Sequence, residues 1–235
     1  MNLKFGLTQQ FQCSYLAEKQ EQLLVLVPDS DKSLASDYSY LAGAGFRRSG
    51  DQIYRPHCAH CRACQSIRIL VEDFVASKSQ RRIMNKNSDL SVFTSSKNKP
   101  EYFPIYEEYI NQRHNDGSMF PASVAQYNGF IQCDWLDTLY IEFYLDQELI
   151  GVAVTDMLEN AFSALYTFFK PEFANRSLGT YAIIQQIEQS RIYGKQFLYL
   201  GYQIDECQKM SYKRNFYPHQ RFIDNKWQLI TKNIT

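Results

Sequence analysis

The sequence predicts an α+β fold, in which helices pack on a mixed sheet. This expectation comes first from residues 162–200, in the second half of the chain. Residues 162–169 are an aromatic, strand-like run that stops at Pro171, and residues 197–200 are a second short apolar run. Between them, Ile183 and Ile187 lie on one face of a helical pattern. A strand, a helix and a returning strand form a crossover unit with parallel strands.

A further observation predicts antiparallel strands just before this unit. Apolar and polar side chains alternate over residues 139–145, which is typical of a strand with one buried face. Asp146-Gln147 is a tight turn, and residues 149–157 continue as a strand that turns again at Glu159-Asn160. We therefore expect three consecutive antiparallel strands that lead into the crossover.

The other elements follow in chain order. In the first part we expect a helix that is capped by Ser33 or Ser36 and ends at Gly43 or Gly45. A second, basic helix is expected to begin with residues 77–82. Strands are expected at residues 23–27, 52–55 and 66–70. From residue 89 onward we expect a strand at 90–94, helices at 101–113 and 122–132, the strands and crossover described above, a helical stretch at 207–215 and a last strand at 227–230.

This order of elements resembles the GNAT acyltransferase fold, including an Arg-x-x-Gly turn at Arg176–Gly179. The resemblance implies that the turn binds a pyrophosphate and that the acyl donor lies where the fourth and fifth strands separate. Free N–H groups and the positive end of the helix dipole suit an anion, although a plain helix start explains the turn equally well. We expect a GNAT-like domain at residues 89–235, with a smaller cysteine-containing α/β region at residues 1–88 packed against it.

Composition and charge limit the possible locations and partners. The chain has 235 residues, of which 45% are hydrophobic and 21% charged, so it is expected to be globular throughout. No run approaches the roughly 18 apolar residues of a membrane span, and the N-terminus lacks the apolar core of a signal peptide, so the cytoplasm is expected. Basic residues dominate 46–88 and acidic residues dominate 101–172. This asymmetry suits a polyanionic partner, or two solvated faces.

Three cysteines follow one another at two-residue gaps. Thiols at Cys58, Cys61 and Cys64 converge on a metal more readily than scattered thiols, and zinc or an iron–sulfur cluster uses such spacings. Candidates for a fourth ligand are Cys13, His57 and His60. The alternative is a reduced, metal-free group of thiols in a loop.

Short motifs through most of the chain resemble the aminoacyl-tRNA–protein transferases, the arginyltransferase family. Those in the first half are Cys13–Leu16, Gly45–Gly50, Tyr54–Cys58, Cys61–Cys64 and Ser77–Arg82. Those in the second half are Arg113-His114, Asp116-Gly117, Ala153–Asp156, Tyr166–Phe169, Arg176–Thr180, Tyr199–Tyr202, Cys207, Lys209-Met210 and Tyr212-Lys213. They occur in the family's order from about Cys13 to Pro218.

The short length is similar to the bacterial branch of the family. That branch takes leucine from leucyl-tRNA and places it on proteins that begin with Asp or Glu, which marks them for degradation by the N-end rule pathway. Relatives that transfer arginine are longer and carry Cys-x-x-Cys where this chain has Cys13-x-x-Leu16, so a shared metal site does not follow. Alternatives are an arginyl-tRNA–protein transferase, an acetyl-CoA-dependent N-acetyltransferase, and a non-catalytic RNA-binding metal protein.

The implied chemistry is acyl transfer from an activated ester to an amine, which needs no cofactor. An α-amino group has a pKa of about 7.7–8.0, so a useful fraction is neutral near pH 7.4 and no strong base is required. A nearby carboxylate to take the proton would help. Asp156, at the end of a predicted central strand, is the candidate acid/base, although a turn residue is an equal alternative. Tyr166 or Tyr202 are candidates for orienting the ester.

The remaining site residues are assigned by charge and position. The 3′ end of the donor tRNA is expected at Arg176, Ser177, Leu178, Gly179, Thr180 and Phe168. An acceptor carboxylate needs a cation, best a guanidinium fork, and the candidates are Arg113, His114 and Arg81. The alternative role for Arg113 is to stabilise the C-terminal end of its helix. Contacts with tRNA phosphates are expected from Arg47, Arg48 and Arg82.

Overall fold

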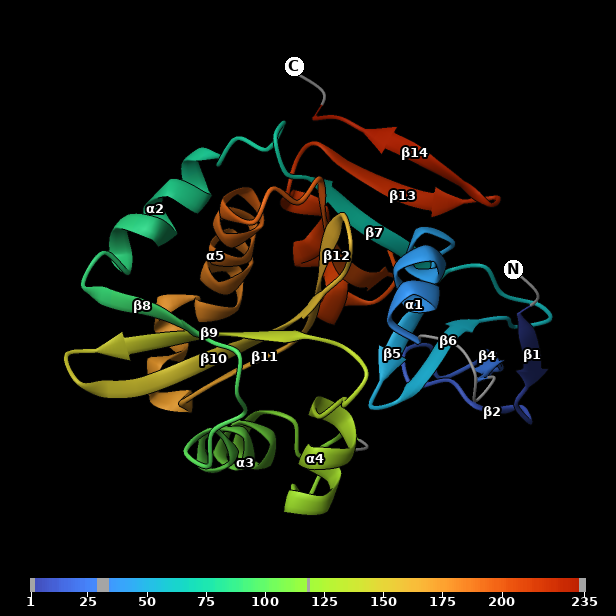
Figure 1. The fold of residues 1–235 in the computed structure, drawn as a ribbon, viewed down its shortest axis with the longest axis horizontal. Coiled ribbons are helices and arrows are strands. Elements are labelled where there is room, and N and C mark those ends of the chain that lie inside the picture. Colours follow the sequence, from blue (N-terminus) through green and yellow to red (C-terminus); the bar gives the residue numbers. More distant parts are fainter. Residues whose placement is uncertain (1–2, 29–33, 118, 233–235) are drawn as a thin grey trace.

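The computed structural model describes residues 3–28, 34–117 and 119–232, which contain one large and one small sheet (Figure 1). The large sheet is mixed, and its eight strands in spatial order are β14 (Lys226–Ile230), β13 (His219–Ile223), β7 (Gln65–Leu70), β12 (Phe197–Gln203), β11 (Ala161–Phe169), β10 (Glu148–Met157), β9 (Thr138–Leu145) and β8 (Leu90–Ser95). The small antiparallel sheet comprises β1 (Lys4–Leu7), β4 (Leu23–Val27), β6 (Gln52–Pro56) and β5 (Arg47–Ser49). A separate pair joins β2 (Phe11–Gln12) to β3 (Gln20–Glu21).

The expected crossover is present between β11 and β12. These two strands are parallel, and the chain passes between them through a 3-10 helix, η1 (Pro171–Arg176), and α5 (Leu178–Ile192). Gly194 lies just beyond α5 with φ +63, as expected for a glycine that ends a helix. The two strands pair only from Ala161↔Phe197 to Ser163↔Tyr199, so their later residues are not paired with each other. Together with the antiparallel β9, β10 and β11, this arrangement confirms the predicted α+β, GNAT-like fold.

Helices cover both faces of the large sheet because successive strand residues point to opposite faces. On one face, Ala182 and Ile187 of α5 pack with strand residues such as Ala153. On the other, α3 (Tyr102–Arg113) and α4 (Val124–Ile131) pack with Val152 and Val154. Figure 1 shows α5 above the strands and α3 and α4 below them. Of the helices within the described residues, none combines the length and apolar character needed to cross a bilayer.

The first part of the chain packs closely against this sheet. Helix α1 (Leu34–Gly43) shares a buried cluster with Phe46 and Ile53 of the first part and Leu158 and Tyr199 of the second. The expected cap Ser33 lies outside the described residues, and Ser36 lies inside the helix. The strand β7 also belongs to the first part, yet it pairs with β12 and β13 in the large sheet. The division at residue 88 therefore stays a prediction.

The second helix of the first part begins as the sequence predicts. Helix α2 (Lys78–Lys86) is preceded by Ser77, whose hydroxyl accepts from the Gln80 N–H while the Gln80 side chain accepts from the Ser77 N–H. This capping box fixes the start of the helix. At the other end of the chain, the stretch expected to be helical forms the 3-10 helix η2 (Gln208–Asn215).

A glycine holds the β5–β6 turn against α4, and its replacement is expected to be costly. Gly50 has φ +55, its N–H donates to the Phe130 carbonyl at 3.1 Å, and an added Cβ would lie 2.1 Å from the Gly129 carbonyl oxygen. Gly50→Ala is expected to lower the free energy of unfolding by about 2–4 kcal/mol, because it adds both backbone strain and a clash with main chain.

Urea unfolding at equilibrium measures the effect, and Gly129→Ala is the matched control. A Cβ at Gly129 would meet nothing within 4 Å, and alanine favours the helix interior over glycine. The control is therefore expected to be neutral or stabilising. A Gly50→Ala protein as stable as the wild type would show that α4 moves aside at no cost.

Candidate functional site

Arg47 lies at the point where β12 parts from β11, near three other expected site residues, Arg48, Asp156 and Tyr202, whereas the remaining expected residues lie elsewhere. Arg47 lies on β5 and is only 5% exposed. Its guanidinium donates to the Ser66 hydroxyl at 3.1 Å and to the Gly201 carbonyl at 3.3 Å, and lies 4.7 Å from the centre of the Tyr199 ring. Burial raises the pKa of Asp156, Tyr38 and Tyr202, and the positive charge of Arg47 acts against this rise. Burial lowers the pKa of Lys213, and the charge of Arg47 lowers it further.

Asp156, the candidate acid/base, is held by the neighbouring Arg48. Both side chains are fully buried, and Arg48 donates to one carboxylate oxygen from Nη2 at 2.5 Å and from Nε at 2.9 Å. The Tyr38 hydroxyl donates to the other oxygen at 3.4 Å. Burial raises the pKa of the Asp156 carboxyl, while Arg48 and the Tyr38 hydrogen bond act against the rise. This pair joins the small sheet to the large one, which is an anchoring role; catalysis by Asp156 stays a prediction.

Lys213 is a buried cation beside Arg47 that the sequence-based assignment did not include. It lies in η2 and is 9% exposed, and its Nζ donates to the Tyr202 carbonyl at 2.7 Å. Burial, and then the charge of Arg47, lowers its pKa to about 8. The Tyr202 hydroxyl points away toward the small sheet, where it donates to the Gly45 carbonyl at 3.1 Å. Burial raises the Tyr202 pKa, so this hydroxyl stays protonated.

Tyr166 belongs to an aromatic group at the later half of β11. Its ring lies 5.4 Å from that of Phe130, 6.2 Å from Tyr106 and 6.3 Å from Tyr109. Burial raises the pKa of Tyr166, followed by its tyrosine neighbours, which include Tyr212 of η2. Tyr106 is fully buried, whereas Tyr109, Phe130 and Tyr166 are partly exposed. These three rings offer flat apolar faces on which an apolar side chain or a base can pack.

The expected donor turn has the predicted backbone but a paired arginine. Ser177 adopts a left-handed conformation with φ +57, and α5 starts at Leu178. The Thr180 N–H already donates to the Ser177 carbonyl at 3.0 Å, so the amides that the turn can offer are those that precede it in α5. Arg176 binds both oxygens of Asp89, at 2.8 and 2.9 Å. Phe168 is fully buried in the core beside α3, so its side chain is poorly placed to contact a donor.

Within the described residues, no hydrogen bond or ion pair joins the expected acceptor residues to Arg47, although Asp116, two residues after His114, pairs with Lys209 of η2. Arg113 is exposed at the end of α3, with its guanidinium 5.3 Å from the Phe169 ring centre. His114 packs on Tyr109, and burial followed by the charge of Arg113 lowers the His114 pKa. Arg81 is exposed on α2 and donates to the Ala76 carbonyl.

The three expected phosphate contacts fall into two environments. Arg82 is exposed on α2, where it is accessible to a polyanion. Arg47 and Arg48 are buried, at 5% and 2% exposure. Arg47 bonds to Ser66 of β7 and Gly201 of β12, and Arg48 bonds to Asp156 of β10. Their burial argues against contacts with the backbone of a tRNA.

The four cysteines expected to bind a metal do not form such a site. Cys58 is buried and directs its Sγ at the Gln22 carbonyl, 3.8 Å away. Burial, and then the thiols of Cys58, Cys13 and Cys61, raises the pKa of Cys64 to about 12, so its thiol is protonated near neutral pH. Within residues 3–28, 34–117 and 119–232, no three His, Cys, Asp or Glu side chains are placed to hold a metal ion. The prediction of zinc or an iron–sulfur cluster finds no support in these residues.

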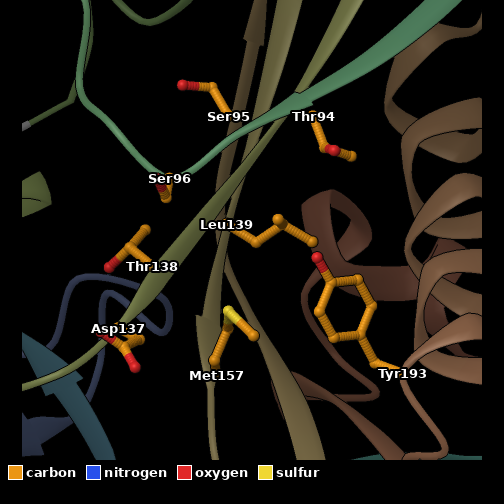
Figure 2. A pocket seen from close by; sticks show the side chains of 8 residues that line it. All are labelled: Thr94, Ser95, Ser96, Asp137, Thr138, Leu139, Met157 and Tyr193. Carbon is orange, nitrogen blue, oxygen red and sulfur yellow. The ribbon is translucent and has the colours of Figure 1, made fainter.

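A pocket of about 420 Å³ lies beside the ends of β9 and β10, next to Asp156 in the sheet (Figure 2). Its walls come from the end of β8, the start of β9 and the end of β10, with Tyr193 after α5 on the far side. The lining side chains are Thr94, Ser95, Ser96, Asp137, Thr138, Leu139, Met157 and Tyr193. None of them is an expected site residue, and Tyr193 lies at the opposite end of α5 from the expected donor turn.

Comparison with protein families identifies two matching regions. Residues 11–82 match the family described as "Arginine-tRNA-protein transferase, N terminus", and residues 101–223 match "Arginine-tRNA-protein transferase, C terminus". A protein of Pseudoalteromonas atlantica named aspartate/glutamate leucyltransferase is 58% identical over 98% of this chain and 99% of its own length. A protein of Aeromonas hydrophila with the same name is 55% identical over 97% and 95%.

Solved structures confirm the fold independently of sequence. The crystal structure of FemX superposes with a TM-score of 0.50, covering 85% of this chain and 71% of that chain at 9% sequence identity. At this identity the likeness concerns the fold alone. It agrees with the GNAT-like arrangement seen in the strand order.

Proposed function

Because the chain belongs to the arginine-tRNA-protein transferase family and is an aminoacyl-tRNA–protein transferase, we propose that it transfers leucine from leucyl-tRNA to the N-terminal α-amine of proteins that begin with Asp or Glu. One observation carries this proposal: relatives of 54–58% identity over nearly the whole chain share the name aspartate/glutamate leucyltransferase. We place the reaction in the cytoplasm, where it would mark its acceptors for degradation.

The reaction is aminolysis of an ester. The acceptor's α-nitrogen attacks the leucyl carbonyl carbon, the bond from that carbon to the tRNA ribose oxygen breaks, and the proton lost by the amine ends on that oxygen. A peptide α-amine with a pKa of about 7.7–8.0 is partly neutral near pH 7.4, so alignment of the two reactants supplies most of what is needed. The bonds formed and broken and the proton transferred are all accounted for by the two substrates, so the reaction requires no cofactor.

The described residues support separate places for donor and acceptor. The turn at Arg176–Thr180 offers helix N-terminal amides for the 3′ end of the donor, and Arg81 and Arg82 of α2 are exposed for phosphates. The aromatic group around Tyr166 is the proposed surface for the aminoacyl ester. Asp156 is proposed as an acid/base only if its ion pair with Arg48 opens. Arg113 and His114 are the more exposed candidate ligands of the acceptor carboxylate, and Arg47 with Lys213 is the buried alternative.

One assay tests the donor and the acceptor together. The protein is incubated with radiolabelled leucyl-tRNA or arginyl-tRNA and with peptides that are identical except for an N-terminal Asp, Glu or Ala. Leucine is expected on the Asp and Glu peptides and not on the Ala peptide. Transfer of arginine instead would make the chain an arginyltransferase. Labelling from acetyl-CoA with neither tRNA active would overturn the proposal in favour of an acetyltransferase.

A further inference from the structure

Two buried cations lie side by side without a counter-charge. Arg47 and Lys213 are 5% and 9% exposed, and their hydrogen bonds go to neutral groups, namely carbonyl oxygens and the Ser66 hydroxyl. In the part of the chain that the structure describes, neither takes part in an ion pair. Moving a charge out of water without an opposite charge is costly, so this arrangement needs a reason.

Arg48 shows what the chain does when a buried arginine is structural. It directly follows Arg47 in β5, and Asp156 accepts two of its hydrogen bonds. Among residues 3–28, 34–117 and 119–232, no carboxylate pairs with Arg47 and its buried Nε has no hydrogen-bond partner. The guanidinium of Arg47 is therefore incompletely satisfied, and its open donor is of the kind that a carboxylate oxygen accepts.

The backbone of β12 brings both cations to one point. Arg47 donates to the Gly201 carbonyl and Lys213 to the carbonyl of the next residue, Tyr202. Gly201 has φ +80, and a Cβ added there would lie 3.6 Å from the Lys213 Nζ. This irregular stretch of β12 follows Tyr199, the last residue paired with β11, so the cations lie where the strands of the crossover are no longer joined.

We propose that Arg47 and Lys213 bind the side-chain carboxylate of the acceptor's N-terminal Asp or Glu. This inference rests on the proposed function. A carboxylate is smaller than a phosphodiester, which carries substituents on both sides, so a carboxylate is the anion that suits two side chains of only 5% and 9% exposure. An acceptor with Asn, Gln or Ala at its N-terminus would leave the two cations unpaired, so the same arrangement excludes neutral acceptors.

The test compares acceptor selectivity in the wild type and in Lys213→Met. The measured quantity is kcat/KM for a peptide beginning with Asp, divided by that for the same peptide beginning with Asn. Lys213→Met keeps the length of the apolar stem and removes the charge. We expect the ratio to fall at least about thirtyfold, the change that corresponds to removing one partner of a buried charge pair, while the Kd for leucyl-tRNA is unchanged.

Lys195→Met is the matched control. Lys195 also donates to main-chain carbonyls, those of Leu158 and Glu159, at 2.8 and 2.9 Å, but it lies at the start of β12. Its replacement is expected to leave the selectivity ratio as it is. Because Lys213→Met removes an uncompensated charge, its melting temperature is expected to match or exceed that of the wild type, so a loss of selectivity is not a loss of folding.

A measurement on the wild type keeps the test decisive if the variant does not fold. The protein is titrated calorimetrically at pH 8 with the dipeptides Asp-Ala and Asn-Ala, in buffers of different ionisation enthalpy. We expect more protons to be taken up on binding Asp-Ala, because a bound carboxylate restores the charge of Lys213. The charged or titratable groups that act on Lys213 are Arg47 of β5 and Cys207 before η2. Equal uptake for the two dipeptides would overturn the inference.

The outcomes separate this inference from the function itself. If the wild type places no leucine on acidic peptides, the proposed function fails before any variant is made. If it does, and Lys213→Met keeps the wild-type selectivity, the inference is wrong. Loss of leucyl-tRNA affinity in Lys213→Met would assign the cations to the donor, and loss of selectivity in Arg113→Ala alone would assign the carboxylate to Arg113.

Discussion

Arg48→Met is expected to lower the free energy of unfolding by about 3–5 kcal/mol, because it leaves the Asp156 carboxylate buried without its counter-charge. Both side chains of this ion pair are 0% exposed, so solvent does not screen it. The Arg48 guanidinium also donates to the Gly50 and Ile131 carbonyls, at 3.2 and 3.3 Å, and these acceptors lose their partner as well. The pair links β5 of the small sheet to β10 of the large one, so we expect the contact between the sheets to loosen first.

The loss is expected to depend on pH in a defined direction. Without Arg48, burial leaves Asp156 with a folded-state pKa above its unfolded value of about 3.9, so the folded variant holds the proton more tightly. A group of this kind contributes stability below the unfolded pKa, and this contribution is lost as the pH rises through the folded one. Arg48→Met is therefore expected to be less destabilised at pH 4.5 than at pH 8, in urea unfolding at both values.

Two further variants distinguish an ion pair from simple packing. Asp156→Asn keeps the shape of the side chain and leaves the Arg48 cation buried without a counter-charge. We therefore expect it to lower the free energy of unfolding by a similar amount. The double variant Arg48→Met/Asp156→Leu removes both charges and is expected to recover part of the loss. The pair is not the anchor between the sheets if Arg48→Met lowers the free energy of unfolding by less than about 1 kcal/mol. The same holds if the loss in the double variant equals the sum of the losses in the two single variants.

The second half of the fold could be predicted because its signals are local. The alternation in residues 139–157 and the helical spacing after Arg176 act over a few residues, and Gly194 ends α5 through its own φ. The structure has β9, β10, β11, α5 and β12 within two residues of the expected starts, and the parallel pairing follows from the crossover. The strands β1, β5 and β13 were not expected, because three to five residues carry too little periodicity.

The candidate site was harder to predict because its contacts span the whole chain. Arg48 and Asp156 are 108 positions apart, and Arg47 and Gly201 are 154 apart. Nothing near Arg47-Arg48 in the sequence indicates burial, since most arginines are exposed. The sequence offered one indication for Lys213, its place in a motif that resembles the aminoacyl-tRNA–protein transferases. Its burial could not be predicted, because it depends on how η2 packs on β12.

Transfer to an Asp peptide is expected to have its highest kcat/KM near pH 8 and to fall about tenfold per pH unit above it. On the acid side, the rate rises as the peptide α-amine loses its proton, with a pKa of about 7.7–8.0. On the alkaline side, the free enzyme loses the charge of Lys213, whose pKa burial lowers to about 8, and with it part of the attraction for the acceptor carboxylate.

Stability is expected to move in the opposite direction over the same pH range, which separates binding from unfolding. The folded-state pKa of Lys213 lies below its ordinary value of 10.5, so between about pH 8 and 10.5 the unfolded chain binds more protons and this group makes the folded state more stable as the pH rises. A falling rate with a melting temperature that holds or increases therefore indicates lost substrate affinity. Initial rates from pH 6.5 to 9.5 test this, with Lys213→Met as the comparison, because the alkaline limb should disappear in that variant. An alkaline limb that persists in Lys213→Met would place the titrating group elsewhere in the enzyme.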